Sequence, residues 1–425
     1  MAAGSAPVMT EPFPAEGLPL EQARQAVLEA LSGSPLVEFV PLQEALGRLS
    51  AAPVLAAESV PGFRAAILDG YAISSGESPA PGTRWELVGR SAPGAPYGAE
   101  LAAGEAIRIL TGAPLPPGAQ RVLPQEQVHC PTASTVELIE AVSDNPWIRA
   151  ADEETSAGQQ LLAAGSRLGT AELARLASCG ISQLAVSIRP RLALLITGDE
   201  LIPPGERRPP GAIWESNGTL LESLLARLGY PVTQKRVVAD DPVALRQALQ
   251  ELAACADVVV STGGVSAGDS DWIRPLLAEL GQVAFWKLFL KPGRPFAFGS
   301  LDGPRGQAIP FFGLPGNPVA AAITALQLLW PALQYLEGAV PQPLLRFQLP
   351  LAQDLRRRGG RPELARARLQ IDGSGGLMAL VEGSQASSRI GSLQDADLLL
   401  ELPAEAAELA AGSLVWAQLL RLPIF

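Results

Sequence analysis

Four short segments combine glycine with acidic or polar residues, a pattern expected of loops that bind an anion. They read TGDE at 197–200, ADDP at 239–242, STGGVSAGDSD at 261–271 and GLPGNP at 313–318. Glycine lets the backbone approach a bulky ligand, and free amides at a helix start bind phosphate. A tight connection that needs no ligand remains an alternative for GLPGNP. The candidate binding residues are Thr197, Gly198, Gly263, Gly264, Ser266, Gly268, Pro315, Gly316 and Asn317.

Three cations stand close together in FWKLFLKPGRPFAFG, which spans 285–299. If 286–290 is a strand, Lys287 and Lys291 lie on one face of it, and the Pro-Gly turn brings Arg294 alongside. Such a group suits an oxyanion, particularly in a chain whose net charge is −11. The alternative is a solvated edge strand whose lysines discourage aggregation.

Carboxylates are also concentrated in these segments, at Asp199, Glu200, Asp240, Asp241, Asp269 and Asp271. They would repel a polyanion unless a divalent ion bridged the two, and oxygen ligands favour Mg²⁺. Helix capping is the alternative, and we expect it for Asp241 and for at least one of Asp269 and Asp271. Capping explains Glu200 and Asp240 less readily, so these two are the stronger candidates for a metal. Elsewhere, Asp69 in ILDGYAI either takes part in catalysis or forms an Asx turn before Gly70.

The elements that must position these residues fall into four regions behind a disordered tail at 1–17. Helical spacing occupies 18–54, including a short helix near 42–49, and returns at 149–187 after an inserted β-rich lid at 55–148. Strands and helices alternate over 188–338, which predicts a mostly parallel α/β sheet. In this region Asp241, Asn317, and either Ser216 or Asn217 begin helices, and Gly229 ends one. A small β domain follows at 339–425.

Composition excludes several classes of function. The 425 residues are 48% hydrophobic, and the net charge of −11 argues against wrapping nucleic acid or binding a membrane surface. Three dispersed cysteines and no recognisable signal peptide predict a reducing, cytoplasmic setting. The apolar stretch 318–336 is interrupted by polar residues, which indicates a buried core helix with a bend at Pro331. The single histidine, His129, is expected to be an ordinary side chain in the β-rich region.

Nine motifs occur in an order that resembles the MoeA-type molybdopterin molybdenumtransferase family, related to the C-terminal domain of gephyrin. They are LDGYA, TGAPLP, TSAG, TGDEL, ESN, DDP, TGGVSAGDSD, FWKLFLKPGRPFAFG and GLPGNPV. The resemblance covers nearly the whole chain from about residue 18. It implies an α/β molybdopterin-binding domain, a lid and a homodimer. It also implies insertion of molybdate into adenylylated molybdopterin, with Mg²⁺ and release of AMP, and a possible partner in the adenylyltransferase of the same pathway.

Matching motif to motif, the resemblance implies roles for Asp69 and Thr111 in the lid. It further implies that Glu200, Asp240 and Asp271 bind Mg²⁺ or orient the pyrophosphate. Lys287, Lys291 and Arg294 would bind the oxyanion. The chain departs from the family pattern at Ala66, Leu68, Ala150, Ala151 and Glu154. In the last domain, loosely matching text leaves Arg361, Ser387 and Ser388 as further candidates. The rival functions are a molybdopterin adenylyltransferase, which would be far shorter and lack the lid, and a gephyrin-like scaffold.

Overall fold

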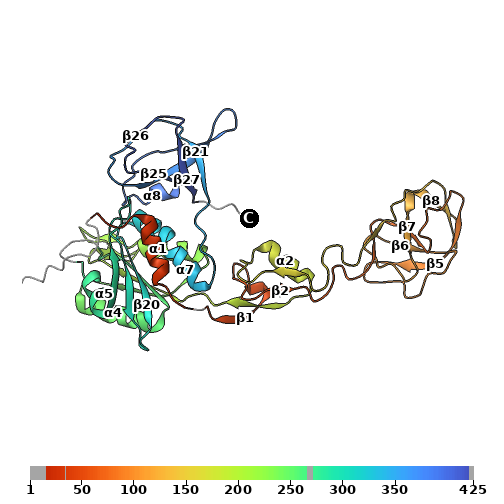
Figure 1. Cartoon of the computed structure of the whole chain (residues 1–425), viewed down its shortest axis with the longest axis horizontal. Coiled ribbons are helices and arrows are strands. Elements are labelled where there is room, and N and C mark those ends of the chain that lie inside the picture. Colours follow the sequence, from red (N-terminus) through yellow and green to blue (C-terminus); the bar gives the residue numbers. More distant parts are fainter. Residues whose placement is uncertain (1–15, 34, 266–270, 421–425) are drawn as a thin grey trace, which may run out of the picture. The chain divides into compact units, whose positions relative to one another are not determined.

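The computed structural model describes residues 16–33, 35–265 and 271–420. The chain forms two compact units, one made of 1–37 with 187–425 and the other of 38–186 (Figure 1). Each unit is described by itself below.

The centre of the first unit is a six-stranded sheet in the order β16-β13-β17-β20-β19-β18. The first four strands are parallel, and β19 and β18 are antiparallel additions at one side. Strands β13 and β17 are buried along their whole length because helices cover both faces of the sheet. The bounds are β13 (Leu192–Thr197), β16 (Val232–Val238), β17 (Val258–Thr262), β18 (Gly281–Trp286), β19 (Ala297–Asp302) and β20 (Ala308–Leu314).

Alternate residues of β13 divide the core into two layers. Leu192, Leu194 and Ile196 share one buried cluster with α1, α3, α6 and α7, whereas Ala193 and Leu195 share the other with α4 and α5. Figure 1 shows α4 and α5 beside the sheet, with α1 and α7 on its other side. The helices are α1 (Leu20–Ala30), α3 (Asn217–Arg227), α4 (Pro242–Cys255), α5 (Ile273–Leu280), α6 (Pro318–Thr324) and α7 (Trp330–Glu337).

Most of the predicted helix ends are confirmed. Asp241 caps α4 by accepting from the Ala244 N–H at 2.8 Å, with Pro242 at the first helical position. Gly229, at φ +93°, follows the end of α3. Asp271 is not the N-cap residue of α5, because Trp272 holds that position, and the Trp272 side chain itself makes no capping hydrogen bond. Asp269 lies outside the described residues.

The apolar helix at 318–337 is continuous but irregular. The turn at Ala325–Leu329 is a π-helix that joins α6 to α7 directly before Pro331. A proline lacks the N–H of a regular helix and its ring crowds the preceding turn, so the wider turn accommodates it. Among the described helices this one alone is long and apolar enough to cross a membrane, yet 83% of its most apolar window is buried inside the protein. It is therefore a core helix.

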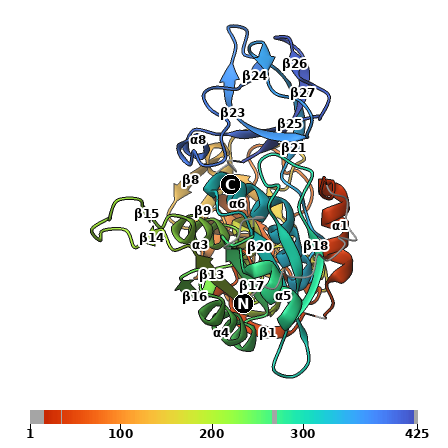
Figure 2. The same cartoon turned by 90° about the vertical axis from the view of Figure 1, so that its left-hand side faces the viewer.

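A five-stranded antiparallel sheet, in the order β21-β27-β25-β23-β24, follows the α/β region (Figure 2). Its own core contains Leu349, Ala365, Leu398 and Leu400. The bounds are β21 (Arg346–Pro350), β22 (Leu355–Arg356), β23 (Glu363–Ile371), β24 (Leu377–Leu380), α8 (Gly391–Gln394), β25 (Leu398–Leu402), β26 (Glu408–Leu409) and β27 (Leu414–Leu419). We call this region the C-terminal β domain.

The second unit is built on another six-stranded sheet, in the order β7-β4-β6-β5-β9-β8. These strands are β4 (Gly70–Ile73), β5 (Arg84–Ser91), β6 (Glu105–Ile109), β7 (Arg121–Pro124), β8 (Val128–Thr132) and β9 (Thr135–Leu138). His129 is an exposed residue of β8. Two-stranded ribbons and one helix complete the unit: β1 (Val37–Pro41), β2 (Val54–Leu55), β3 (Ala65–Ala66), β10 (Ile148–Arg149), β11 (Gln160–Leu162), α2 (Thr170–Ser178) and β12 (Gln183–Ser187).

The prediction of a short helix near 42–49 is wrong. Only a single 3-10 turn forms at Leu42–Glu44. Gly47 then adopts φ +69°, and Leu49 and Ser50 form β-bridges with Arg167 and Val186. Apolar spacing in this stretch therefore reflects packing against α2 and β12, because tertiary contacts override a weak helical pattern.

Candidate functional site

The four glycine-containing segments meet at the carboxyl ends of the parallel strands, as expected for an open α/β sheet. They line a pocket of about 670 Å³, here called the sheet-edge pocket. The predicted residues that it brings together are Thr197, Gly198, Glu200, Asp240, Gly263, Gly264, Asp271, Pro315, Gly316 and Asn317. Ser266 and Gly268 lie outside the described residues.

Asn217, one of the two residues predicted to begin a helix, connects two of these loops by hydrogen bonds. Its Nδ2 donates to Thr262 Oγ1 at 2.9 Å and to the Gly316 carbonyl at 2.8 Å. Thr262 Oγ1 in turn donates to the Pro315 carbonyl at 3.1 Å. The ESN motif includes Asn217, but a motif alone does not show that this side-chain amide bonds residues from two other loops.

The glycines at 263 and 264 serve the contact between loops. Gly263 has φ +93°, and a Cβ there would lie 2.4 Å from the Thr197 carbonyl oxygen. A Cβ on Gly264 would lie 2.9 Å from the Ile273 side chain. At Gly316, in contrast, the nearest atom would be 3.6 Å away. Close approach at the TGG loop is thus made by other parts of the protein itself, whereas a Cβ on Gly316 would make only an ordinary van der Waals contact.

The carboxylates are partly engaged within the loops. Asp240 accepts a hydrogen bond from Thr197 Oγ1, and its N–H donates to Asp199 Oδ1 at 2.9 Å. Glu200, Asp240 and Asp271 all line the sheet-edge pocket. Across the part of the chain that the structure describes, no three His, Cys, Asp or Glu side chains cluster closely enough to hold a metal ion. The carboxylate oxygens of Glu200, Asp240 and Asp271 are of the kind that Mg²⁺ prefers. A metal ion bound by them would need further ligands from substrate or water.

A second pocket, of about 470 Å³, contains most of the predicted cations. We call it the basic pocket; it is lined by Lys291, Arg294, Arg361, Gln385, Ser387 and Ser388, among others. Pro295, Asn317 and Ser388 line both pockets, so the two adjoin. Arg361, Ser387 and Ser388 come from the C-terminal β domain, which therefore supplies part of this site.

The prediction that Lys287 and Lys291 share a strand face is wrong. Strand β18 ends at Trp286, and Lys287 adopts φ +68°. The chain turns there because the Lys287 N–H donates to the Phe296 carbonyl while its own carbonyl accepts from Leu18 N–H. As far as the described lining residues show, Lys287 lies outside both pockets.

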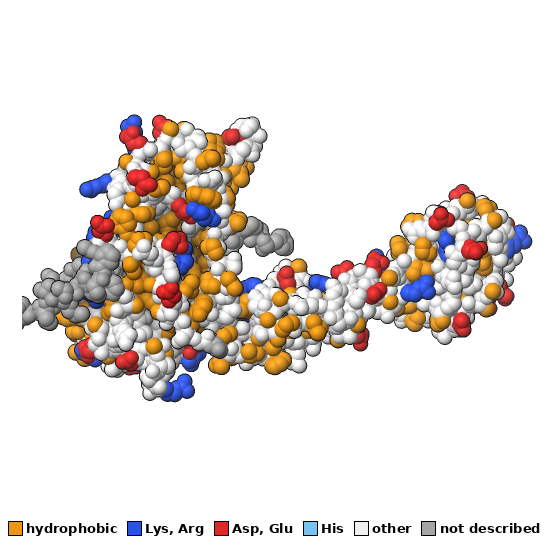
Figure 3. Space-filling model, viewed as in Figure 1, with side chains coloured by type: hydrophobic (Ala, Val, Ile, Leu, Met, Phe, Trp, Pro, Cys, Tyr) orange, Lys and Arg blue, Asp and Glu red, His pale blue; other side chains and the backbone are white. Residues whose placement is uncertain are grey.

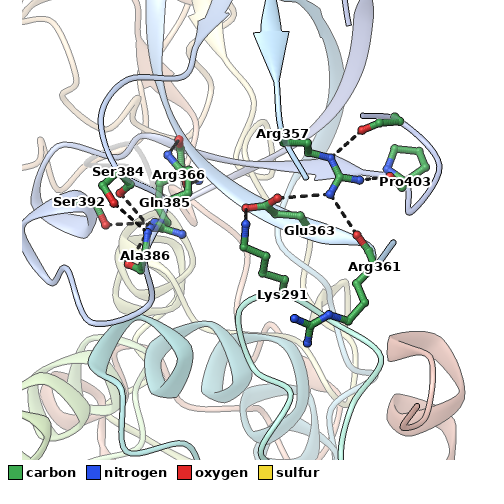
Figure 4. Close-up of polar contacts among 11 residues, drawn as sticks. Lys291, Arg357, Arg361, Glu363, Arg366, Ser384, Gln385, Ala386, Ser392 and Pro403 are labelled. Carbon is green, nitrogen blue, oxygen red and sulfur yellow. Dashed lines mark hydrogen bonds and ion pairs between the residues drawn. The ribbon is translucent and has the colours of Figure 1, made fainter. Parts of the chain in front are cut away.

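Lys291 is held by the C-terminal β domain through its backbone and through its side chain, whose contact with Glu363 is drawn in Figure 4. Its Nζ lies 2.9 Å from Glu363 Oε1, and Glu363, only 2% exposed, also pairs with Arg357 at 3.3 Å. The Lys291 N–H donates to the Pro362 carbonyl at 2.9 Å, and its carbonyl accepts from Leu364 N–H at 2.8 Å. This arrangement fixes the position of an ammonium at the rim of the basic pocket.

Arg366 shapes the loop that carries Ser387 and Ser388. It is 3% exposed, and burial lowers the pKa of its guanidinium. Figure 4 shows its bonds to the Ser392 hydroxyl at 3.1 Å and to the Ala386 carbonyl at 3.2 Å. The Ser387 carbonyl accepts from Val319 N–H at 3.1 Å. The C-terminal β domain thus accepts a hydrogen bond from one of the α6 amides predicted to face a phosphate.

In the other unit, Asp69 and Thr111 form a direct pair. Asp69 Oδ1 accepts from the Thr111 N–H and from Thr111 Oγ1, both at 2.8 Å. These hydrogen bonds, the backbone one first, hold the pKa of the Asp69 carboxyl below its usual value. The carboxylate therefore joins two segments 42 residues apart. This link to Thr111 differs from both alternatives given for Asp69 above, a catalytic role and an Asx turn before Gly70.

Comparisons with known proteins agree with this architecture. The chain matches the family models for the MoeA N-terminal region, domains I and II (18–180), a probable molybdopterin binding domain (193–335) and the MoeA C-terminal region, domain IV (348–420). It is 32% identical to the molybdopterin molybdenumtransferase of Haemophilus influenzae over 94% of this chain and 97% of that protein. Gephyrin from Dictyostelium discoideum is 27% identical over 95% of this chain and 62% of its own length. A crystal structure of the molybdopterin biosynthesis MoeA protein from Pyrococcus horikoshii matches with a TM-score of 0.79 and 28% identity, covering 95% of this chain and 99% of that one.

The fold and the pockets at its sheet edge define a multi-domain α/β enzyme of the molybdopterin-binding class. The chain belongs to the MoeA family of molybdopterin molybdenumtransferases. Membership makes it a transferase of molybdenum cofactor biosynthesis, as the resemblance predicted.

Proposed function

We propose that the chain inserts molybdate into the dithiolene of molybdopterin, using adenylylated molybdopterin as substrate and releasing AMP. The observation that carries this proposal is the junction of the two pockets at Pro295, Asn317 and Ser388. One pocket is lined by glycine loops and carboxylates, and the other by cations. A substrate with a pyrophosphate and a neighbouring oxyanion therefore meets suitable groups on both sides.

In this mechanism the basic pocket binds molybdate. Lys291, Arg294 and Arg361 supply charged donors, and the hydroxyls of Ser387 and Ser388 supply neutral ones. The dithiolene sulfurs are themselves the nucleophiles: molybdenum–sulfur bonds form as molybdate oxygen is lost as water, and hydrolysis of the phosphoanhydride releases AMP. No covalent protein nucleophile is needed, because the protein contributes orientation and charge neutralisation.

Mg²⁺ would be held by one or two carboxylates from among Glu200, Asp240 and Asp271, with substrate and water oxygens completing its shell, and it would neutralise charge on the pyrophosphate. The Thr197 hydroxyl fixes the orientation of Asp240 for this role. From the family resemblance we infer that Asp69 and Thr111 act in a lid.

The same proposal includes a cytoplasmic homodimer that can receive its substrate from the adenylyltransferase of the pathway. Cys130, Cys179 and Cys255 are free thiols, which supports a reducing setting. On the face drawn in Figure 3, the described basic side chains are scattered among acidic ones. Light scattering on the purified protein tests the dimer.

The decisive experiment incubates purified protein with adenylylated molybdopterin, Mg²⁺ and molybdate and follows AMP release. Lys291→Ala and Asp240→Ala are expected to lower the rate at least about tenfold. Lys235→Ala is the matched control, because Lys235 is a surface lysine paired with Glu222. If both test variants kept the full rate, the proposed site would be wrong.

A further inference from the structure

The segment between Glu200 and Glu215 places an exposed tryptophan at the sheet-edge pocket. Strands β14 (Leu201–Ile202) and β15 (Ile213–Trp214) pair in parallel, and the loop between them projects beside α3 (Figure 2). Trp214 is 49% exposed. It is the only aromatic residue among the described residues that line the pocket. An exposed indole in a pocket of glycines and carboxylates has a large apolar face available to a ligand.

Several contacts hold this ring in place without burying it. The Ile213 N–H donates to the Glu200 carbonyl and the Glu215 N–H to the Ile202 carbonyl, each at 2.8 Å. The indole Nε1 donates to the Glu206 carbonyl at 3.3 Å, and the Arg208 guanidinium lies 4.7 Å from the ring centroid. Since backbone and ring are both anchored, a ligand that stacks on the ring does not have to order it first.

We propose that Trp214 is a stacking platform for a flat bicyclic heteroaromatic ring of the substrate. The inference rests on the proposed function, because adenylylated molybdopterin carries two rings of this kind, a pterin and an adenine. Trp214 lines the sheet-edge pocket and does not line the basic pocket. The heteroaromatic ring therefore sits at Trp214, whereas the oxyanion sits at Lys291 and Arg294. Stacking of this type depends on the π face and tolerates either ring.

The chain offers a matched control for this tryptophan. Trp416 in β27 is 39% exposed and also carries an arginine on its ring, with the Arg346 guanidinium 3.7 Å from the centroid. Trp416 lines a different pocket, against the α1 region and the C-terminal β domain. Replacing it removes the same chemical group from a place where no substrate ring is proposed.

Calorimetric titration with AMP and, separately, with 6-hydroxymethylpterin tests the proposal on the full chain. We expect Trp214→Ala to weaken at least one of the two ligands about tenfold, and the weakened ligand identifies the ring that stacks. Trp214→Phe should restore most of the affinity, because it keeps a π face. Trp416→Ala should bind both ligands as the unaltered protein does, and molybdate binding should be the same in all variants.

Unchanged binding of both ligands by Trp214→Ala would overturn the proposal, as would an unaltered protein that binds neither. Equal loss in Trp214→Phe and Trp214→Ala would also overturn it, because loss would then not follow the π face. Circular dichroism establishes that each variant is folded. AMP release from adenylylated molybdopterin is measured in parallel. Turnover with normal ligand binding by Trp214→Ala rejects only the stacking platform, whereas absence of turnover in the unaltered protein rejects the proposed function.

Discussion

The ammonium of Lys291 lies 2.9 Å from the carboxylate of Glu363, a buried residue of the C-terminal β domain. The same carboxylate pairs with Arg357, whose side chain is 7% exposed. Two cations thus share one anion, and a net positive charge remains at the rim of the basic pocket. The C-terminal β domain is therefore part of the candidate site, and Glu363 is a positioning residue for Lys291.

Glu363→Gln should raise the KM for molybdate about tenfold while leaving the KM for adenylylated molybdopterin nearly unchanged. An uncharged amide holds the ammonium less firmly, and it leaves the buried Arg357 without its counter-ion. Steady-state AMP release at varied molybdate concentrations measures the effect. Glu408→Gln is the control. Both side chains of the Arg356–Glu408 ion pair are exposed to solvent, so its loss should change stability and KM little. Equal KM changes for both substrates would contradict a positioning role.

Asn217→Asp should destabilise the protein by about 1–2 kcal/mol. The substitution keeps the shape of the side chain but removes the Nδ2 donor that bonds Thr262 Oγ1 and the Gly316 carbonyl. Urea unfolding measures the free energy of unfolding. A variant as stable as the unaltered protein would show that the two loops hold their places without this amide.

Two glycine substitutions should have opposite consequences. Gly263→Ala should lower the free energy of unfolding by about 2 kcal/mol or more, because φ is +93° and the Cβ would lie 2.4 Å from the Thr197 carbonyl oxygen. Gly316→Ala should leave stability nearly unchanged, since its Cβ would meet nothing within 3.5 Å. The Gly316 variant should instead weaken AMP binding, because the methyl group narrows the pocket. Thermal unfolding and calorimetry, applied to both variants, separate these effects.

Thr111→Val should raise the pKa of Asp69 toward its usual value of 3.8 without reaching it. The substitution removes the hydroxyl donor and retains the stronger backbone N–H bond. Because the folded-state pKa is lowered, the stabilisation is present above pH 3.8 and is lost as pH falls through the folded pKa. Asp69 is therefore ionised throughout the neutral range. Carboxyl chemical shifts followed by NMR between pH 2 and 6 measure the change, and an unaltered titration would exclude the Thr111 hydroxyl as a cause.

Much of the fold follows from local sequence patterns. The alternation of strands and helices over 188–338, the helix that begins at Asp241 and the core helix containing Pro331 were all predicted correctly. These features depend on residues within one turn or one strand of each other, so periodicity and capping rules suffice. The failures lie where distant contacts decide: the stretch 42–49 packs against another segment, and Lys287 turns out of its strand through bonds to Phe296 and Leu18.

The sequence by itself determined which chemical groups are present, their order along the chain and the mostly parallel α/β sheet of residues 188–338. Only the tertiary structure decided that Arg361 joins Lys291 and Arg294 in one pocket, that Glu363 holds Lys291, and that Trp214 reaches the sheet-edge pocket. The physical reason is separation along the chain. Lys291 and Glu363 are 72 residues apart. Their contact depends on how two independently patterned domains pack, which no local periodicity encodes.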